Sequence, residues 1–248
     1  MEKLPIIPLE DGRKTRSDGA QSRERLLLTA MRLFAEQGYA RTSTREIALA
    51  AGTNIASISY YFGDKAGLYR AAFTEKKPRK CDDIAAICHP GASLRESLAA
   101  FYGVLLAPLK QGDLARLSIR LLFREMLEPT GLWHEEIDNG IRPAHAGLTL
   151  LLARHLGIAE PDDDLSRLAF SVVGLAVQMM VAREVIDKIR PQLLGSEAAI
   201  DTWIARLVDY AEAMVQAEQA RRASPSAPPA APAAPAATPT PPPRKKTA

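Results

Sequence analysis

The stretch from Thr42 to Tyr69 constrains this chain most, because it has the pattern of two short helices joined by a tight turn. Ser43 stands where an N-cap residue is expected, and Glu46 three residues later completes a capping box. The apolar stripe that follows ends at Gly52, a residue favoured where a helix ends in a left-handed conformation and the chain reverses. The first short helix is therefore expected to begin after Ser43 and to end at Gly52.

The second short helix completes a supersecondary pattern. Asn54 can cap it, and Ile58 and Phe62, four residues apart, share one face. Ala48 is small where the two helices must cross, Gly52 makes the turn, and Ile58 packs underneath. This combination predicts a helix-turn-helix, the motif that places its second helix in the major groove of DNA.

The charge of the chain is divided along its length in a way that fits a DNA reader joined to another domain. Residues 1–80 hold 15 Lys/Arg against 9 Asp/Glu, residues 81–220 hold 12 against 20, and residues 221–248 add five basic residues. A basic amino-terminal module on an acidic body is expected of a nucleic-acid-binding protein with a separate sensory or assembly domain. A solvated surface alone would also explain the charge, but its coincidence with the helix-turn-helix favours DNA binding.

The motif residues also carry a family resemblance. The segment from Thr44 to Lys65, with TREIA, the AG turn and YYFGDK, resembles the DNA-binding domain of the TetR family of bacterial regulators, and Leu68 follows it. The run RLLLTAMRLFAEQG, Arg25 to Gly38, resembles the first helix of that domain. Most members carry Tyr where this chain has Ser59, so a DNA contact from that position is not carried over.

A looser resemblance concerns the body of the chain. The wording NIASISYYFGDK is closer to the CecR-like branch of the family. The segment FREMLEPT, Phe123 to Thr130, followed by Ile141-Arg142-Pro143, is similar to the effector domain of that branch. The resemblance therefore implies an effector-binding body behind the DNA-binding module.

The resemblance implies a set of DNA contacts whose chemistry is suitable. Ala56 lets the backbone approach the bases, Ile55 can touch a thymine methyl group, and Ser57 can hydrogen-bond a base edge or a phosphate. Thr44 and Arg45 open the first short helix, where free amides and a guanidinium suit a phosphate. The full set of expected DNA-binding residues is Thr44, Arg45, Asn54, Ile55, Ala56, Ser57, Tyr60, Tyr61 and Lys65.

The whole chain is expected to be all-α in two domains. Residues 1–21 mix Pro, Gly and charge without periodicity and are interpreted as a disordered arm. Residues 22–68 are expected to form the three-helix DNA-binding domain, and residues 69–222 a helical effector-binding and dimerisation domain. Residues 224–243 are almost wholly Ala and Pro with a few Ser and Thr, and residues 223–248 are expected to be a disordered tail that ends in a basic cluster. Candidate helices in the body are 93–110, 113–128, 131–156 (with a break near Gly140 to Pro143), 163–187 and 196–221.

The helix expected at 163–187 is apolar on nearly every side between Leu168 and Val181. A helix with this composition is buried in a large core or at a subunit interface. The resemblance implies that it supplies half of a dimeric four-helix bundle together with the last helix. The residues expected at this interface are Val173, Val177, Trp203, Leu207 and Ala211.

An effector pocket is expected within the body, lined by polar or aromatic residues that interrupt apolar helix faces. Each such residue is also open to a simpler interpretation as a surface charge or a satisfied buried group, and Arg124 with Glu125 as a structural ion pair. The candidates, proposed as a group, are Arg120, Arg124, Trp133, His134, Gln178 and Arg183.

The sequence carries no catalytic signature. His134-Glu135 lacks the second His of a HExxH zinc site, and no P-loop, GxSxG or dinucleotide fingerprint is present. Cys81 and Cys88 are the only cysteines, and their spacing is not that of a standard zinc site. An enzyme, a cofactor and a bound metal are therefore not expected.

The first 25 residues lack the apolar core segment of a signal peptide, and the longest uncharged run outside the Ala/Pro-rich tail, Leu168 to Ala182, has 15 residues. We therefore expect no signal peptide, no membrane partner and a cytoplasmic location. The predicted function is a homodimeric transcriptional repressor that binds a double-stranded DNA operator and is released by a small-molecule effector. An activator, a ligand-independent regulator, and a helical small-molecule-binding protein that no longer meets DNA remain as alternatives.

Overall fold

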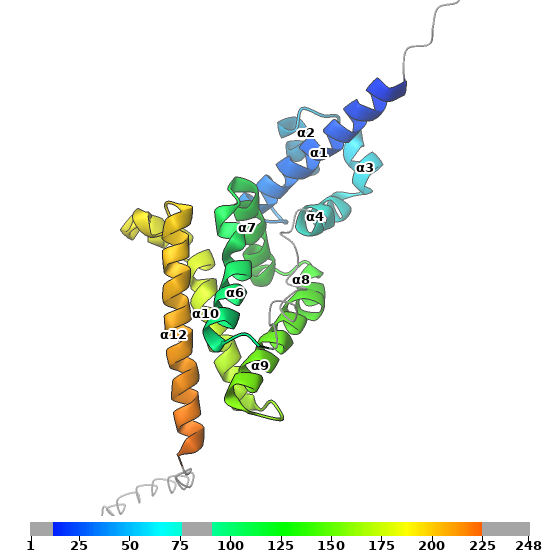
Figure 1. The fold of residues 1–248 in the computed structure, drawn as a ribbon. Helices are drawn as coiled ribbons and strands as arrows, with labels where there is room; N and C mark the ends of the chain where they lie inside the picture. Colours follow the sequence, from blue (N-terminus) through cyan, green and yellow to red (C-terminus); the bar gives the residue numbers. More distant parts are fainter. Residues whose placement is uncertain (1–11, 76–90, 225–248) are drawn as a thin grey trace, which may run out of the picture.

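The computed structural model describes residues 12–75 and 91–224, and every regular element within these two ranges is a helix (Figure 1). Cys81, Cys88, the first eleven residues and residues 225–248 lie outside the described ranges. The amino-terminal unit consists of α1 (Gly12–Gln37), α2 (Thr44–Ala50), α3 (Ala56–Phe62) and α4 (Lys65–Thr74).

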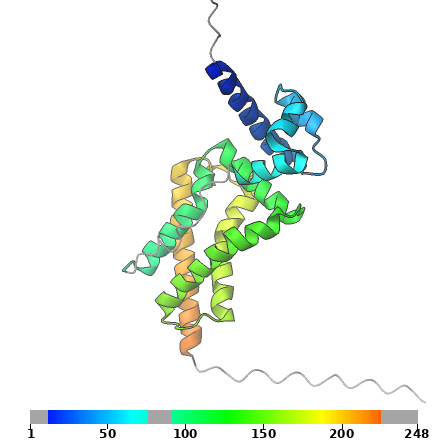
Figure 2. The ribbon, with the colours of Figure 1, turned by 90° about the vertical axis from the view of Figure 1, so that its right-hand side faces the viewer.

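The body consists of helices that run beside one another below this unit. Both views show the amino-terminal unit at one end of the body (Figures 1 and 2). The longest helix of the body is α12. The elements are α6 (Leu94–Leu106), η1 (Ala107–Lys110), α7 (Asp113–Leu127), α8 (Leu132–Glu136), η2 (Ile137–Ile141), α9 (Arg142–Leu156), α10 (Asp163–Val181), α11 (Arg183–Ile189), η3 (Pro191–Leu193) and α12 (Glu197–Ala223).

The first helix begins earlier than the sequence indicates. We expected it to start near Ser22, after an arm without structure, whereas α1 begins at Gly12. Residues 13–18 are polar and carry no apolar periodicity, so the pattern that reveals an amphipathic helix is missing there. No proline interrupts this segment, and the helix therefore extends through it.

The two short helices form as the capping residues predict. The Ser43 hydroxyl accepts a hydrogen bond from the amide of Glu46 at 3.1 Å, and the Glu46 carboxylate accepts one from the amide of Ser43 at 3.5 Å. Gly52 has φ +63°, and Asn54 Oδ1 accepts from the amide of Ala56 at 2.9 Å. The capping box and the glycine turn are therefore confirmed, and Asn54 binds the first amide of α3 from the residue before the N-cap, Ile55.

The fourth helix begins directly against the end of α3. Asp64 caps it by accepting a hydrogen bond from the amide of Gly67 at 2.7 Å. A Cβ atom on Gly67 would lie 2.0 Å from the carbonyl oxygen of Phe62, so only glycine fits. Buried residues of α4 as far as Phe73 belong to the amino-terminal core, so the boundary expected after Leu68 falls inside α4.

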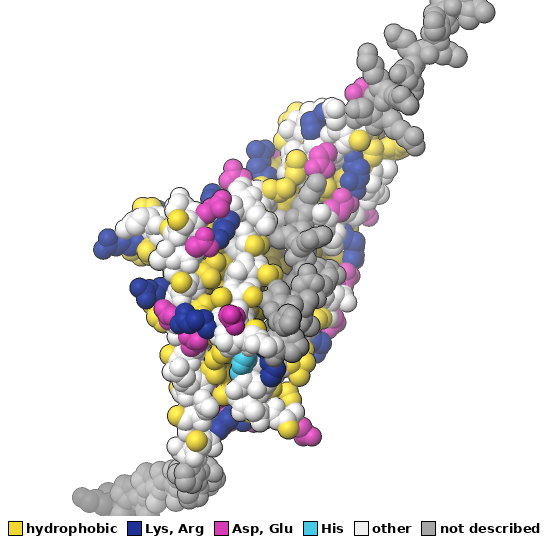
Figure 3. Space-filling view, viewed as in Figure 1, with side chains coloured by type: hydrophobic (Ala, Val, Ile, Leu, Met, Phe, Trp, Pro, Cys, Tyr) yellow, Lys and Arg dark blue, Asp and Glu magenta, His cyan; other side chains and the backbone are white. Residues whose placement is uncertain are grey.

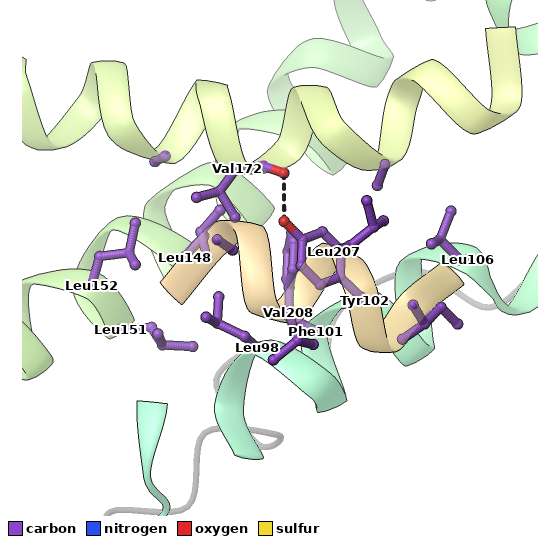
Figure 4. Close-up of a cluster of buried hydrophobic side chains, with 14 of the residues drawn as sticks. Leu98, Phe101, Tyr102, Leu106, Leu148, Leu151, Leu152, Val172, Leu207 and Val208 are labelled. Carbon is purple, nitrogen blue, oxygen red and sulfur yellow. Dashed lines mark hydrogen bonds between the residues drawn. The ribbon is translucent and has the colours of Figure 1, made fainter. Parts of the chain in front are cut away.

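The core of the body is formed by one face each of α6, α9, α10 and α12 (Figure 4). Tyr102 is fully buried among leucines, and its hydroxyl donates a hydrogen bond to the carbonyl oxygen of Val172 at 2.9 Å. Burial raises the pKa of the Tyr102 phenol, so the group stays neutral and its one donor is satisfied.

Two of the expected body helices have a different course. The helix expected at 163–187 ends at Val181, and α11 follows as a separate arm. The chain folds back there because Leu194 is buried in the core and its carbonyl accepts from Arg183 Nη2 at 3.2 Å. The break expected near Gly140 is instead a π-helical turn, η2, that leads without interruption into α9 and accommodates the missing amide of Pro143.

By length and composition, α10 is the one helix in the described ranges that could cross a membrane. In the structure its buried residues pack into the body core, while Phe170 and Val181 on the opposite face are 62% and 58% exposed. Within a single protomer only one face of this helix is covered, so burial of the opposite face at a subunit interface stays a prediction.

Candidate DNA-binding surface and ligand groove

The third helix presents a distinct outer face. Ile58 is 2% exposed and packs into the amino-terminal core, whereas Tyr60 is 82% exposed. Ala56 and Ser59 are also exposed, and Ser57 is half-buried. The outer face of α3 is therefore small and polar, with one projecting aromatic ring.

The remaining residues expected at DNA surround this face. Asn54 and Arg45 are exposed, Ile55 is 49% exposed, and Thr44 is half-buried at the start of α2. Two others make contacts within the protein, which sequence alone did not indicate. The Tyr61 ring packs edge-on against Tyr60 and Phe62, and the Lys65 ammonium lies 4.4 Å from the centre of the Tyr39 ring.

A close seam joins this unit to the body at the end of α1. Arg124 of α7 donates from Nε to the carbonyl of Ala35 at 3.2 Å and from Nη2 to the carbonyl of Glu36 at 3.1 Å. Gly38 follows with φ +86°, and a Cβ atom there would lie 3.0 Å from Arg124 Nη1. The last turn of α1 has no basic residue of its own, so Arg124 supplies the donors that its carbonyls need.

The next residue on α7 fastens the same seam to α4. Glu125 is fully buried and accepts hydrogen bonds from the Tyr69 hydroxyl at 2.7 Å, the Thr130 amide at 2.8 Å and the Trp133 amide at 3.1 Å. Burial, and then the bond to Glu125, raises the pKa of Tyr69. Arg124 and Glu125 therefore bind different partners, and the interpretation of the two as an ion pair with each other is wrong.

Sequence reasoning missed this seam. The available signal was an Arg-Glu pair within the FREMLEPT segment, but adjacent residues on a helix point about 100° apart, and their separate partners come from elements distant in sequence. The seam also includes Leu121 and Leu132, which are body residues buried in the amino-terminal core.

A groove of about 440 Å³ lies between α7 and the junction of α10 with α11. Three of the expected ligand residues, Arg120, Arg124 and Arg183, line it. The other lining residues were not expected and are Leu109, Arg116, Ile119, Phe123, Leu127, Glu128, Met180, Val181 and Glu184.

The other three expected ligand residues lie elsewhere. Trp133 is half-buried beside Glu125, to which its amide donates, and His134 is exposed on α8. Gln178 is exposed on α10 and is not among the groove residues. Arg120, Arg124 and Arg183 therefore form the group that the structure brings together.

The residues expected at a dimer interface divide into two sets. Leu207 and Ala211 are 2% and 0% exposed within a single protomer, so they belong to its own core and are unavailable to a partner. Val173, Val177 and Trp203 are half-buried at the edge of α10 and α12. Figure 3 shows yellow apolar side chains along α12 and on the projecting α11 arm.

Comparison with known proteins supports both parts of this architecture. The family model described as bacterial regulatory proteins, tetR family, matches residues 26–72. The model described as the C-terminal domain of the HTH-type transcriptional dual regulator CecR matches residues 94–217. The dual regulator CecR of Shigella flexneri is 32% identical over 179 residues, which cover 68% of this chain and 79% of that protein.

Solved structures share the fold at lower identity. A HlyIIR mutant, in which one segment is replaced by a linker, superposes with a TM-score of 0.55 at 20% identity, covering 77% of this chain and 97% of that one. A transcriptional regulator from Saccharomonospora viridis in complex with choline superposes with a TM-score of 0.54 at 21% identity, covering 78% and 96%.

A capped helix-turn-helix at one end of a helical body, together with these relatives, defines a DNA-binding transcriptional regulator. The chain belongs to the TetR family, in the branch that carries a CecR-type carboxy-terminal domain.

Proposed function

We propose that the chain is a cytoplasmic, homodimeric repressor that binds an operator through α3 and releases it when a small molecule binds the body. The observation that carries this proposal is the division of α3 into a buried face with Ile58 and an outer face with Tyr60. An outer face of this composition suits close approach to base edges, and free amides near Thr44 with Arg45 suit phosphates.

An exposed apolar surface supports the dimer. Phe170 and Tyr210, on α10 and α12, are 62% and 54% exposed, and Val177 and Trp203 lie half-buried on the same helices. Burying these groups against a second copy would remove apolar area from water. Two protomers related by a two-fold axis would then present two α3 helices to the half-sites of a palindromic operator.

The seam between α1 and α7 supports ligand control. The groove that Arg120 and Arg183 line also includes Arg124, which holds the last turn of α1. A ligand in the groove would therefore act on the contacts that orient the reading helices, and differential binding to two such orientations is what allostery requires.

Lys65 offers a test of DNA binding. Titrating the region upstream of the gene with the full chain by fluorescence anisotropy should show specific binding, and Lys65→Ala should weaken binding to all sequences alike. The slope of log affinity against log salt should fall by about one phosphate per protomer. The control is Lys188→Ala, an exposed lysine on α11. Equal effects of the two variants would contradict the assignment of Lys65, and absence of any operator binding would favour the non-DNA alternative.

The dimer has its own test in a matched pair of exposed residues. Phe170 and Leu150 are both 62% exposed, but only Phe170 lies on the proposed interface. Phe170→Asp should shift the mass measured by light scattering to that of a monomer, because it replaces apolar surface, a ring stacked on His145, by a charge that is costly to bury. Leu150→Asp should leave the mass unchanged. A dimeric Phe170→Asp protein would remove α10 from the interface.

A further inference from the structure

The groove between α7, α10 and α11 combines apolar walls with an unusual number of guanidinium groups. Four arginines and two glutamates line it, together with Leu109, Ile119, Phe123 and Met180. Apolar lining with a few convergent polar groups is typical of small-molecule sites. The excess of arginines selects the charge of the ligand, because guanidinium groups bind carboxylates in a bidentate manner.

Arg183 has hydrogen-bonding capacity that the protein does not use. Its Nε donates to Asp187 at 3.1 Å and its Nη2 to the carbonyl of Leu194 at 3.2 Å, so the side chain is held in place. Its Nη1 is buried and makes no hydrogen bond within the part of the chain that the structure describes. An unsatisfied buried donor is unfavourable, and an acceptor on a ligand would satisfy it.

The ion pairs in the groove are long, so a ligand carboxylate can replace the glutamates as the acceptor of the arginines. Arg120 lies 3.5 Å from Glu184, and Arg124 lies 3.4 Å from Glu128, both longer than the usual separation of a charge-assisted hydrogen bond. The side chains of Glu184 and Glu128 are 85% and 59% exposed, so either carboxylate can turn into solvent without desolvation.

We propose that this groove binds a small organic anion in which a carboxylate is joined to a flat apolar ring system. We further propose that Arg124 transmits the binding of this ligand to α1. This proposal deepens the proposed function and rests on it only for the effect on DNA. The carboxylate of the ligand binds Arg183 and Arg120, and its apolar ring system packs against Phe123 and Met180. Arg124 turns toward the added charge, so the carbonyls of Ala35 and Glu36 lose their donors.

The carbonyl groups at the end of α1 have different donors, and this explains the role of Arg124. Arg41 Nε donates to the carbonyl of Gln37 at 3.0 Å, and the Thr42 hydroxyl donates to that of Gly38 at 2.8 Å. Among the described residues, the carbonyls of Ala35 and Glu36 accept side-chain hydrogen bonds from Arg124 alone, and Arg124 belongs to the body. Occupancy of the groove is therefore coupled to these two carbonyls through the Arg124 guanidinium.

The binding step is tested by calorimetry on the full chain with 2-naphthoate, and with 2-naphthamide as the neutral match. We expect naphthoate to bind on the order of tenfold more tightly than naphthamide. Arg183→Gln and Arg120→Gln should each remove most of that preference. The control Arg142→Gln, an exposed arginine of α9, should retain it. Equal affinity for the two probes, or a preference that survives in Arg120→Gln, would overturn the proposal. Arg120 is exposed, so its variant should fold even if Arg183→Gln does not.

The coupling step is tested by hydrogen exchange of residues 35–41 without DNA. Saturating naphthoate should speed exchange of this segment in the natural protein, and Arg124→Gln should exchange fast with or without naphthoate. Unchanged exchange in the natural protein at saturation would overturn the role of Arg124.

A parallel anisotropy titration with operator DNA separates this inference from the proposed function. Naphthoate binding that speeds exchange but does not release DNA would support the groove and the coupling, and would contradict release by an effector. DNA release by another compound with no binding of naphthoate would support effector control and overturn the anion site.

Discussion

The buried hydrogen bond between Tyr69 and Glu125 gives the sharpest test of how the reading unit is fixed to the body. The two side chains are 3% and 0% exposed, and the hydroxyl donates to the carboxylate at 2.7 Å. Tyr69→Phe removes the donor and keeps the ring. Glu125→Met keeps a similar volume but removes every acceptor oxygen.

The magnitudes follow from what each change leaves unpaired. Tyr69→Phe removes a hydrogen bond to a charged group, worth about 1.5–3 kcal/mol, although Glu125 keeps the donors of Thr130 and Trp133. Glu125→Met leaves the Tyr69 hydroxyl and the Trp133 amide without their acceptor, at about 1–3 kcal/mol each, less what is regained because no charge is buried. Thr130 is exposed, so water can replace its lost partner.

The assay is urea unfolding of the two single variants and the double variant, followed by circular dichroism. The double-mutant cycle should give a coupling energy of about 1.5–3 kcal/mol, because the double variant has no stranded phenol. As a control, Glu135→Gln breaks the exposed ion pair that joins Arg70 to α8, with side chains 55% and 53% exposed. Because solvent screens that exposed pair, its loss should destabilise the protein far less than loss of the buried bond. A coupling energy below about 0.5 kcal/mol for Tyr69 and Glu125 would refute the reasoning.

Two further predictions concern other parts of the fold. Gly67→Ala should lower the melting temperature by several degrees, because its Cβ would lie 2.0 Å from a backbone oxygen. As a control, a Cβ on Gly103 of α6 meets nothing within 4 Å, so Gly103→Ala should be neutral or stabilising by up to about 1 kcal/mol. Equal melting temperatures of the two variants would contradict the close approach at Gly67. Arg222 donates to Asp162 and lowers the pKa of that carboxyl, so the pair stabilises the fold above the ordinary Asp pKa of about 3.9 and loses its effect as pH falls through the lowered value. Arg222→Gln should therefore destabilise the protein in urea titrations at pH 7 and progressively less below about pH 4, and a difference that grows toward acid would contradict the assignment.

Much of the amino-terminal unit could be predicted because its determinants are local. Ser43 and Glu46 are three residues apart, Gly52 follows the helix that they start, and Ile58 and Phe62 are one turn apart. Caps, turns and short apolar stripes act within a few residues, so the pattern alone indicates them. The expected contacts of these residues with DNA stay a prediction.

Less of the body could be predicted from local sequence patterns. The composition of 163–187 indicated an apolar helix, but the place where it ends depends on Leu194, which returns to the core from beyond the break. Similarly, apolar residues on α12 gave no sign that Leu207 and Ala211 face the core of their own protomer whereas Tyr210 faces outward. A helical period identifies a stripe, but not which neighbour covers it.

By itself, the sequence determined the helical class, the helix-turn-helix with its caps and turn, and the resemblance that the family comparison confirmed. Only the tertiary structure decided which arginines share a groove. It also decided that Arg124 binds α1 and Glu125 binds α4, and that the two do not pair with each other. The physical reason is distance along the chain. Tyr69 and Glu125 are 56 residues apart, and no local preference encodes a contact that exists only after separate helices have packed.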